Sequence, residues 1–187
     1  MILWTIQPIE VYEKLMETGE YICNFKKSVM KYYQDTYDWL VEQMISKIGD
    51  PPDCVKYPVW AWYKDGKKYK PDLRNARFGY GKKGDKYACI EIEVPDEDVV
   101  LSDFDNWIVI LNDGLISETE EEDEIIEKTY NSLSEEEKKI MKSENWRRVF
   151  DISPFNNGWD VRGEYIQATF WMLKKDYIRG VRFFTAG

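Results

Sequence analysis

The sequence predicts an α+β fold in a single domain, because short segments of alternating apolar and polar residues are interspersed with segments of helical periodicity. At 187 residues the chain is long enough to bury one sizeable core. Residues 165–173 alternate most clearly, with Ile166, Ala168, Phe170 and Met172 on one face of a strand and Gln167, Thr169 and Trp171 on the other. The residues of the apolar face are expected to pack in the hydrophobic core. The other face suits a surface or the floor of a ligand cleft.

The first quarter of the chain predicts one strand and two helices. Residues 2–7 alternate, with Ile2, Trp4 and Ile6 on one side and Leu3, Thr5 and Gln7 on the other. Pro8 is placed to begin a helix, and Gly19 to end it as a left-handed cap. Helical spacing predicts a longer helix from about residue 27 to residue 48, where a glycine and two prolines follow.

The middle of the chain predicts two strands separated by a turn and a loop. Residues 57–63 form an aromatic strand, and residues 64–67 carry the turn signal Lys-Asp-Gly-Lys. Residues 78–84 predict a glycine-rich basic loop, whose spacing matches neither of the common phosphate-binding motifs. Residues 86–94 predict a strand with one apolar face, which consists of Ala88, Ile90, Ile92 and Val94.

The last part of the chain predicts a short helix, an insertion and the closing strands. Ser102 is expected to cap a helix that reaches Leu111. Residues 118–145 are acidic and lysine-rich and predict a two-helix insertion, with a capping box from Ser134 to Glu137. A loop at residues 156–158 precedes the strand at residues 165–173.

Composition excludes several kinds of chemistry. Histidine is absent, so Ser-His-Asp and Cys-His catalysis and histidine zinc sites are excluded. The three cysteines are scattered, which indicates neither a disulfide framework nor a metal site, and no metal is expected. The net charge of −9 argues against broad binding to nucleic-acid backbones and fits either simple solubility or a basic protein partner. No membrane span or signal peptide is predicted, so a cytoplasmic protein is expected.

Several motifs carry a resemblance to known families. The segments LWTIQP, YPVWAWY, PDLR, LSDFD and IQATFW together resemble a domain-of-unknown-function family of bacteria and phages, over nearly the whole chain. A fainter similarity joins the chain to the ADP-ribosyltransferase superfamily, in particular its branch of toxins that modify DNA. That similarity implies a strongly curved, split sheet with surrounding helices, and NAD or a related nucleotide as cofactor.

The same similarity implies roles for individual residues. Thr5 falls at the first-strand position that holds NAD, Arg74 at a position to reach a phosphate, and Gln7 and Trp171 are assigned to cofactor binding with them. Trp60, Trp62 and Tyr63 belong to the aromatic strand that would lie against the nicotinamide.

The catalytic position departs from the superfamily pattern. Where the superfamily has Gln-Ala-Glu, this chain has Gln167-Ala168-Thr169, so the expected carboxylate is missing. Gln167 and Thr169 share a strand face and are expected to contact a ribose, and Glu91 or Glu93 would supply a displaced carboxylate. The resemblance therefore leaves open whether the chain transfers ADP-ribose.

Each of these assignments has a structural alternative. The tryptophans are more often core or rim residues, the polar residues of the strands are often ordinary flanking groups, and Arg74 has a nearby partner in Asp72. Two other functions stay open: a non-catalytic acidic interaction or inhibitor protein, encoded by a phage or mobile element and binding a host protein, and a small-molecule or nucleobase sensor. The nucleotide interpretation predicts that Thr5 and Gln167 face a common cleft.

Overall fold

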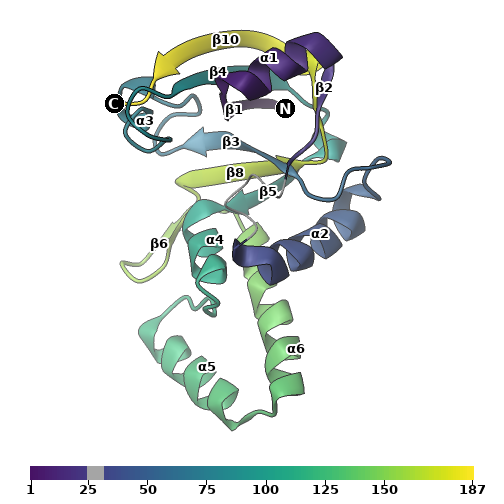
Figure 1. The fold of residues 1–187 in the computed structure, drawn as a ribbon. Helices are drawn as coiled ribbons and strands as arrows, with labels where there is room; N and C mark the ends of the chain where they lie inside the picture. Colours follow the sequence, from purple (N-terminus) through teal and green to yellow (C-terminus); the bar gives the residue numbers. More distant parts are fainter. Residues whose placement is uncertain (25–31) are drawn as a thin grey trace.

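The computed structural model of the protein describes residues 1–24 and 32–187 (Figure 1). The first half contains β1 (Ile2–Pro8), α1 (Ile9–Thr18), β2 (Glu20–Tyr21), α2 (Gln34–Ile48), β3 (Val59–Asp65), α3 (Leu73–Ala76) and β4 (Lys86–Glu93). The second half contains η3 (Asp96–Asp98), β5 (Val100–Asp103), α4 (Phe104–Leu111), α5 (Glu120–Ser132), α6 (Glu135–Trp146), η4 (Arg147–Phe150), β6 (Phe155–Asn156), β7 (Val161–Arg162), β8 (Tyr165–Phe170), β9 (Leu173–Lys174), η5 (Lys175–Tyr177) and β10 (Ile178–Thr185). In these ranges no helix has the length and apolar character that crossing a bilayer requires.

Six of the described strands form one antiparallel sheet, in the order β10-β4-β1-β3-β8-β5. The first strand, the aromatic strand and the late strand of the resemblance therefore lie side by side as β1, β3 and β8. The register pairs Trp4 with Trp62, and Trp62 with Gln167. The alternation of the strands predicts that the first strand lies next to the late strand or next to the aromatic strand, and this is confirmed for the aromatic strand, β3.

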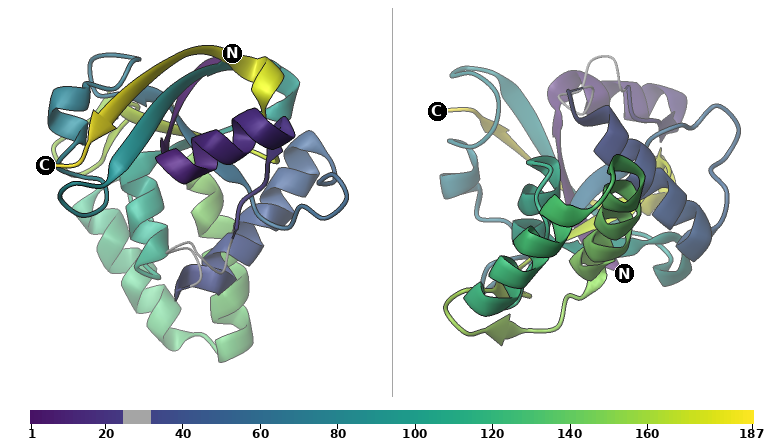
Figure 2. Two further views of the ribbon diagram at one scale, coloured as in Figure 1. Left: turned by 45° about the horizontal axis from the view of Figure 1, so that its top comes forward. Right: turned by 90° about the horizontal axis from the view of Figure 1, so that it is seen from below.

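One face of the sheet packs under α1, in the core that we call the α1 core (Figure 2). It consists of alternate residues of the strands together with residues from α1 and the strand ends: Leu3, Leu15, Val59, Ala61, Ala88, Ile90, Ile92, Val94, Val99, Ala168, Phe170 and Leu173. The apolar faces predicted for β4 and β8 are part of this core. Tyr12 of α1 adds an edge-to-face contact with Phe183, at a ring-centroid distance of 5.3 Å.

The opposite face is divided between helices and a loop. Below β3, β5 and β8 it packs against α2, α4 and η4, in a core that contains Tyr37, Trp39, Leu40, Met44, Val55, Tyr57, Val100, Trp107, Ile110, Ile116, Trp146, Val149 and Trp171. Over β4 and β10 the same face meets the segment between β3 and β4, where Tyr80 contacts Tyr87 and Phe184. We call the part of this opposite face that the helices leave uncovered the open face. It borders a hollow that is described below.

The pairing of β1 contradicts one sequence expectation. Residues directly opposite each other in a sheet share a face, so Trp4, Trp62 and Gln167 lie on the open face. Thr5 and Gln7 point the other way, into the α1 core. Thr5 is fully buried; its Oγ1 donates to the Trp60 carbonyl at 2.8 Å and accepts from Gln7 Nε2 at 2.7 Å. The prediction that Thr5 and Gln167 face a common cleft is wrong.

Element boundaries also differ from the predictions. Ser102 belongs to β5, and the N-cap of α4 is Asp103, whose Oδ1 accepts from the Asn106 amide at 3.0 Å. Asp103 Oδ2 also accepts from the Gly163 amide at 2.7 Å, a bond that serine at position 102 could not make from the neighbouring strand position. The predicted helix over residues 27–48 matches α2 from Gln34 onward, and residues 27–31 lie outside the described ranges.

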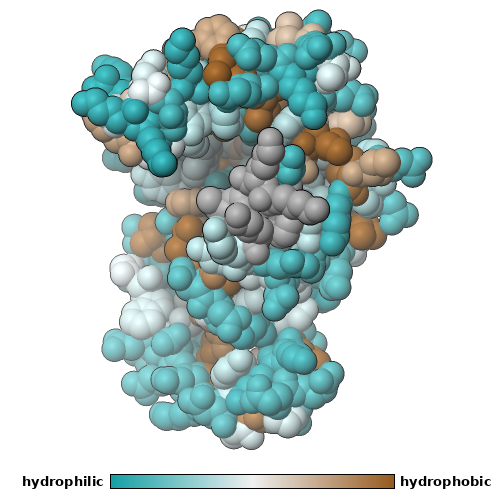
Figure 3. Space-filling model, in the orientation of Figure 1, coloured by the Kyte–Doolittle hydropathy of each residue, from teal (hydrophilic) through white to brown (hydrophobic). Residues whose placement is uncertain are grey.

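The acidic insertion is a helical hairpin made by α5 and α6. Ser134 and Glu137 form the predicted capping box, in which each side chain bonds the other residue's backbone amide. Arg148 of η4 clamps the hairpin with a bidentate pair to Glu122, at 2.7 and 3.1 Å. In Figure 3 this end of the molecule presents a largely hydrophilic surface.

Candidate functional site

A hollow lies on the open face, where β1, β3 and β8 are adjacent. It has a volume of about 420 Å³, within the usual range for ligand pockets. We call it the lysine hollow, and its walls are Ile6, Trp62, Asp65, Gly66, Lys67, Lys68, Lys70, Pro71, Asp72, Tyr80 and Tyr165. Most of these residues come from the turn after β3, which folds back over the sheet.

Two aromatic side chains join the sheet to the loop that covers it. Trp62 Nε1 donates to the Tyr80 hydroxyl at 3.2 Å, and the Trp62 ring also meets Phe104 at a centroid distance of 5.2 Å. Burial raises the pKa of Tyr80, so this hydroxyl stays protonated at neutral pH. At the turn, Gly66 adopts a left-handed φ of 68°, and a Cβ there would lie 3.4 Å from the Tyr165 hydroxyl. These aromatic rings therefore border the lysine hollow, and the left-handed backbone at Gly66 defines the shape of the turn beside it.

The basic charge in the lysine hollow is only partly compensated. Lys70 is ion-paired with Glu91 at 3.1 Å, whereas Lys67 and Lys68 form no ion pair with any described carboxylate. Glu91 Oε2 also accepts from Trp4 Nε1 at 3.1 Å. The hydrogen bonds from Trp4 and Lys70 lower the pKa of Glu91, so it carries a negative charge at neutral pH. Lys67 and Lys68 can therefore bind an anion, although the charge of Lys68 also lowers the pKa of Asp72 in the same hollow.

The pKa values of the two aspartates of the hollow are shifted in opposite directions. Burial raises the pKa of Asp65, and this effect outweighs a hydrogen bond from the Asp72 backbone, which lowers it. Arg74 holds the pKa of Asp72 well below its usual range, through bonds of 3.0 and 2.7 Å to the two carboxylate oxygens. Arg74 is largely exposed and does not line the hollow. Its predicted contact with a phosphate would require it to leave Asp72.

The remaining residues assigned from the resemblance are divided between three places. Gln167 stands opposite Trp62 in the sheet but does not line the lysine hollow, and its Oε1 is buried without a hydrogen-bond partner among the described residues. Trp60 packs on Trp107 under the helices, at a centroid distance of 5.1 Å. Trp171 is in the same core, where its Nε1 donates to the Gly49 carbonyl at 3.1 Å. Tyr63 lies on the α1 side, against the ring of Tyr69.

The predicted catalytic residues are separated as well. Thr169 is 1% exposed, and its Oγ1 makes a long 3.4 Å bond to the Val100 carbonyl, next to Trp60 in the register. Glu93 is exposed and ion-paired with Arg179 at 2.9 Å. Glu91 is the predicted carboxylate that a hydrogen bond joins to a wall of the lysine hollow. Of the residues assigned from the resemblance, Gln167, Trp62 and Glu91 therefore lie in one row across the sheet, and Trp62 lines the lysine hollow.

Sequence reasoning missed the residues that dominate this hollow. Lys67, Lys68 and Lys70 follow the turn signal, and Tyr80 lies in the glycine-rich basic loop that matched no phosphate motif. A usable signal was present, because residues 64–86 contain nine lysines and arginines in a chain of net charge −9. What the sequence could not show is that this basic segment folds onto β1 and β3.

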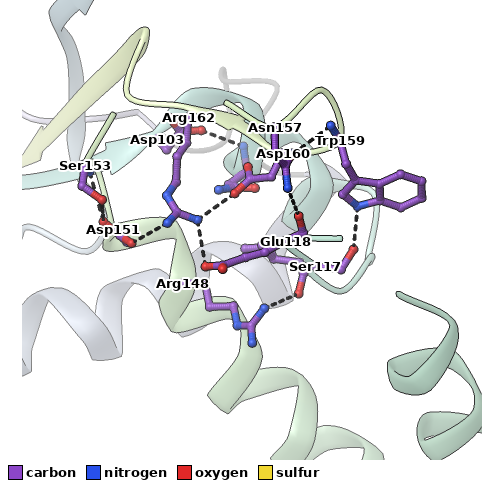
Figure 4. Close-up of polar contacts among 12 residues, drawn as sticks. Asp103, Ser117, Glu118, Arg148, Asp151, Ser153, Asn157, Trp159, Asp160 and Arg162 are labelled. Atoms are coloured by element: carbon purple, nitrogen blue, oxygen red, sulfur yellow. Dashed lines mark hydrogen bonds and ion pairs between the residues drawn. The ribbon is translucent and has the colours of Figure 1, made fainter. Parts of the chain in front are cut away.

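A second hollow, of about 360 Å³, lies between α4, the start of α5 and the β6–β7 hairpin. We call it the aspartate hollow, and its walls are Asp105, Asn106, Val109, Leu115, Ile116, Ser117, Asp123, Trp159, Asp160 and Val161. Figure 4 shows the polar network beside it, in which Arg162 reaches Glu118, Asp151 and Asp160 at 3.0, 3.1 and 2.7 Å. This network fixes the hairpin against α5.

Comparison with known proteins gives one match. A family model described as "Domain of unknown function (DUF3841)" matches residues 2–179. No curated protein and no solved structure matches the chain.

Proposed function

We propose that this chain, which belongs to the family described as a domain of unknown function, DUF3841, binds NAD or a related nucleotide in the lysine hollow. The observation that carries the proposal is the combination of three lysines, two of them in no ion pair with a described carboxylate, with aromatic rings around one space of about 420 Å³. Lysine ammonium groups bind phosphates as point charges, and aromatic rings bind the flat faces of bases or of nicotinamide. In this proposal the lysines contact the phosphates of the nucleotide, and the aromatic rings contact its base or its nicotinamide.

The arrangement of the sheet supports the comparison with ADP-ribosyltransferases. The resemblance requires the first strand, the aromatic strand and the late strand to act together, and β1, β3 and β8 are neighbours. Trp62 and Gln167 stand directly opposite each other on the open face. In this proposal Trp62 contacts the nicotinamide or the base, and Gln167 Oε1 accepts from a ribose hydroxyl.

Transfer of ADP-ribose forms the second part of the proposal. Breaking the bond between ribose and nicotinamide leaves positive charge on the ribose, and an ionised carboxylate nearby stabilises that charge. Glu91 is ionised and is joined through Lys70 to the hollow, so we propose it as the displaced carboxylate. Asp65, which lines the hollow directly, is a further candidate that the sequence did not suggest.

Binding is tested by thermal denaturation and tryptophan fluorescence with NAD and with ADP-ribose. A ligand that binds only the folded protein raises its melting temperature, and Trp62 should report the occupied site. The double variant Lys67→Gln with Lys68→Gln is expected to weaken binding by about tenfold or more, because two charge-assisted phosphate contacts are lost.

The matched control is Lys82→Gln with Lys83→Gln, which removes the same charge from two exposed lysines outside the hollow. Its effect should stay within about twofold, since distant exposed charges are screened by salt. Absence of both a thermal shift and a fluorescence change at millimolar NAD would reject nucleotide binding. Equal losses in the two double variants would reject the lysine hollow as its site.

A further inference from the structure

The walls of the aspartate hollow carry acidic charge and no basic side chain. Asp105, Asp123 and Asp160 line it together with apolar residues from α4 and the segment before α5. Asp160 is compensated by Arg162 at 2.7 Å, but neither Asp105 nor Asp123 forms an ion pair with a described lysine or arginine. Such a space favours a cation that carries apolar groups.

The environment of Asp105 confirms that negative charge is concentrated here. Burial raises the pKa of Asp105, and the carboxylates of Asp103 and Glu164 raise it further. Burial also raises the pKa of Asp160. A bound cation would relieve this repulsion. Among the described residues no three acidic or sulfur side chains gather closely enough to hold a metal ion, so an organic cation fits the spacing better.

Two further side chains, those of Asn106 and Trp159, indicate that the ligand carries other binding groups besides a positive charge. Asn106 lines the hollow and is 7% exposed, and its Nδ2 is buried without a hydrogen-bond partner in the described chain. This donor requires an acceptor such as a peptide carbonyl. Trp159 stands at the rim with its ring half exposed, and its Nε1 donates to Ser117 Oγ at 3.1 Å (Figure 4). Ser117 Oγ in turn donates to Asp123 Oδ1 at 3.0 Å.

We infer that the aspartate hollow binds an arginine side chain from a basic segment of a partner protein. The guanidinium would lie between Asp105 and Asp123 and against the face of Trp159, since a planar cation both pairs with carboxylates and stacks on an indole. Val109, Leu115 and Ile116 would pack on the aliphatic part of the arginine. Asn106 would donate to a carbonyl of the same segment. This site is separate from the lysine hollow and does not depend on nucleotide binding.

The test uses a blocked peptide of alternating arginine and glycine, with a twin in which citrulline replaces arginine. Citrulline keeps the size and planarity of arginine but has no charge. Calorimetric titration of the full chain should show the arginine peptide binding at least about tenfold more tightly than its twin, because a charge pair in a shielded site is lost. Asp105→Asn and Asp123→Asn should each weaken binding by about threefold to tenfold.

The matched control is Glu121→Gln, which removes the same charge from an exposed position in the first turn of α5. Its effect should stay under about twofold, as expected for a solvated charge outside the site. Thermal melts of all variants check that they fold, and each asparagine keeps the size of the aspartate it replaces and one of its two acceptor oxygens. Equal binding of the citrulline peptide, tighter binding of a lysine peptide, equal effects of all three variants, or no binding would each overturn the inference.

Discussion

The indole of Trp62 and the hydroxyl of Tyr80 are joined by a 3.2 Å hydrogen bond that connects the middle of the sheet with the loop over its open face. The two residues are on opposite sides of the turn that supplies Lys67, Lys68 and Lys70. The hydrogen bond therefore connects the two ends of the segment that carries the lysines of the lysine hollow.

Tyr80→Phe tests this connection. The substitution keeps the ring contacts with Tyr87 and Phe184 but leaves the partly buried Trp62 N–H without its acceptor. Unfolding in urea should show a loss of about 1 kcal/mol. Tyr69→Phe, at an exposed ring, should change stability by less than about 0.5 kcal/mol and serves as the control. Equal effects of the two variants would mean that the hydrogen bond contributes nothing.

The carboxylate assignment is tested by release of nicotinamide from NAD. Glu91→Gln removes the charge beside Lys70 while keeping side-chain size, so the rate should fall by about a hundredfold or more. Glu93→Gln should have a smaller effect, since Glu93 is exposed and paired with Arg179.

Nicotinamide release is measured for both variants, for wild type and for a buffer blank, with and without DNA or protein acceptors. Equal losses in the two variants would contradict the role of Glu91. Wild type that releases no nicotinamide would exclude transfer chemistry. Nucleotide binding would still be decided separately by the thermal shift with NAD.

Thr169, which stands where the glutamate is missing, and Gln167 should respond differently to a new carboxylate. Thr169→Glu places a charge in the core beneath the helices, where the residue is 1% exposed, and should cost about 3 kcal/mol or more. Gln167 is less deeply buried and stands opposite Trp62, so Gln167→Glu should cost less and raise nicotinamide release. Chemical denaturation measures the first effect and the NAD assay the second. A fully stable Thr169→Glu protein would show that this core admits solvent.

The bidentate pair between Glu122 and Arg148 predicts a pH dependence of stability. Hydrogen bonds from Arg148 and from the Glu118 amide lower the folded-state pKa of Glu122. Between its folded and unfolded pKa values the unfolded chain binds more protons, so stability rises with pH there. The contribution is complete above about pH 5 and is lost as pH falls below the ordinary glutamate value of about 4.3.

Glu122→Gln should therefore lower the free energy of unfolding by about 1 kcal/mol at pH 7, and by less at pH 3.5. Urea unfolding at both pH values measures the difference from wild type. Glu127→Gln, at an exposed position of the same helix, should leave the free energy of unfolding nearly unchanged at both values. A deficit that stays constant across this pH range would contradict the charge-based explanation.

Local patterns in the chain were sufficient for most of the elements. Alternation identified β4 and β8 and their buried faces, because a strand places every second side chain on the same side. Gly19 and the Ser134–Glu137 box marked helix ends, since capping depends on neighbouring backbone groups. These features depend on interactions within a few residues, which a sequence records directly.

The open face and its hollow depend on contacts between distant residues. Thr5 and Gln167 have similar local patterns, yet Thr5 is buried under α1 while Gln167 shares the opposite face with Trp62, because the register pairs Trp62 with Gln167 and leaves Thr5 on the other side. Ile6, Lys68 and Tyr165 line the same hollow although they are far apart in the chain. The alternation of a strand defines two faces, and only the packing of α1, α2 and the loop over residues 66–85 decided which one stays open.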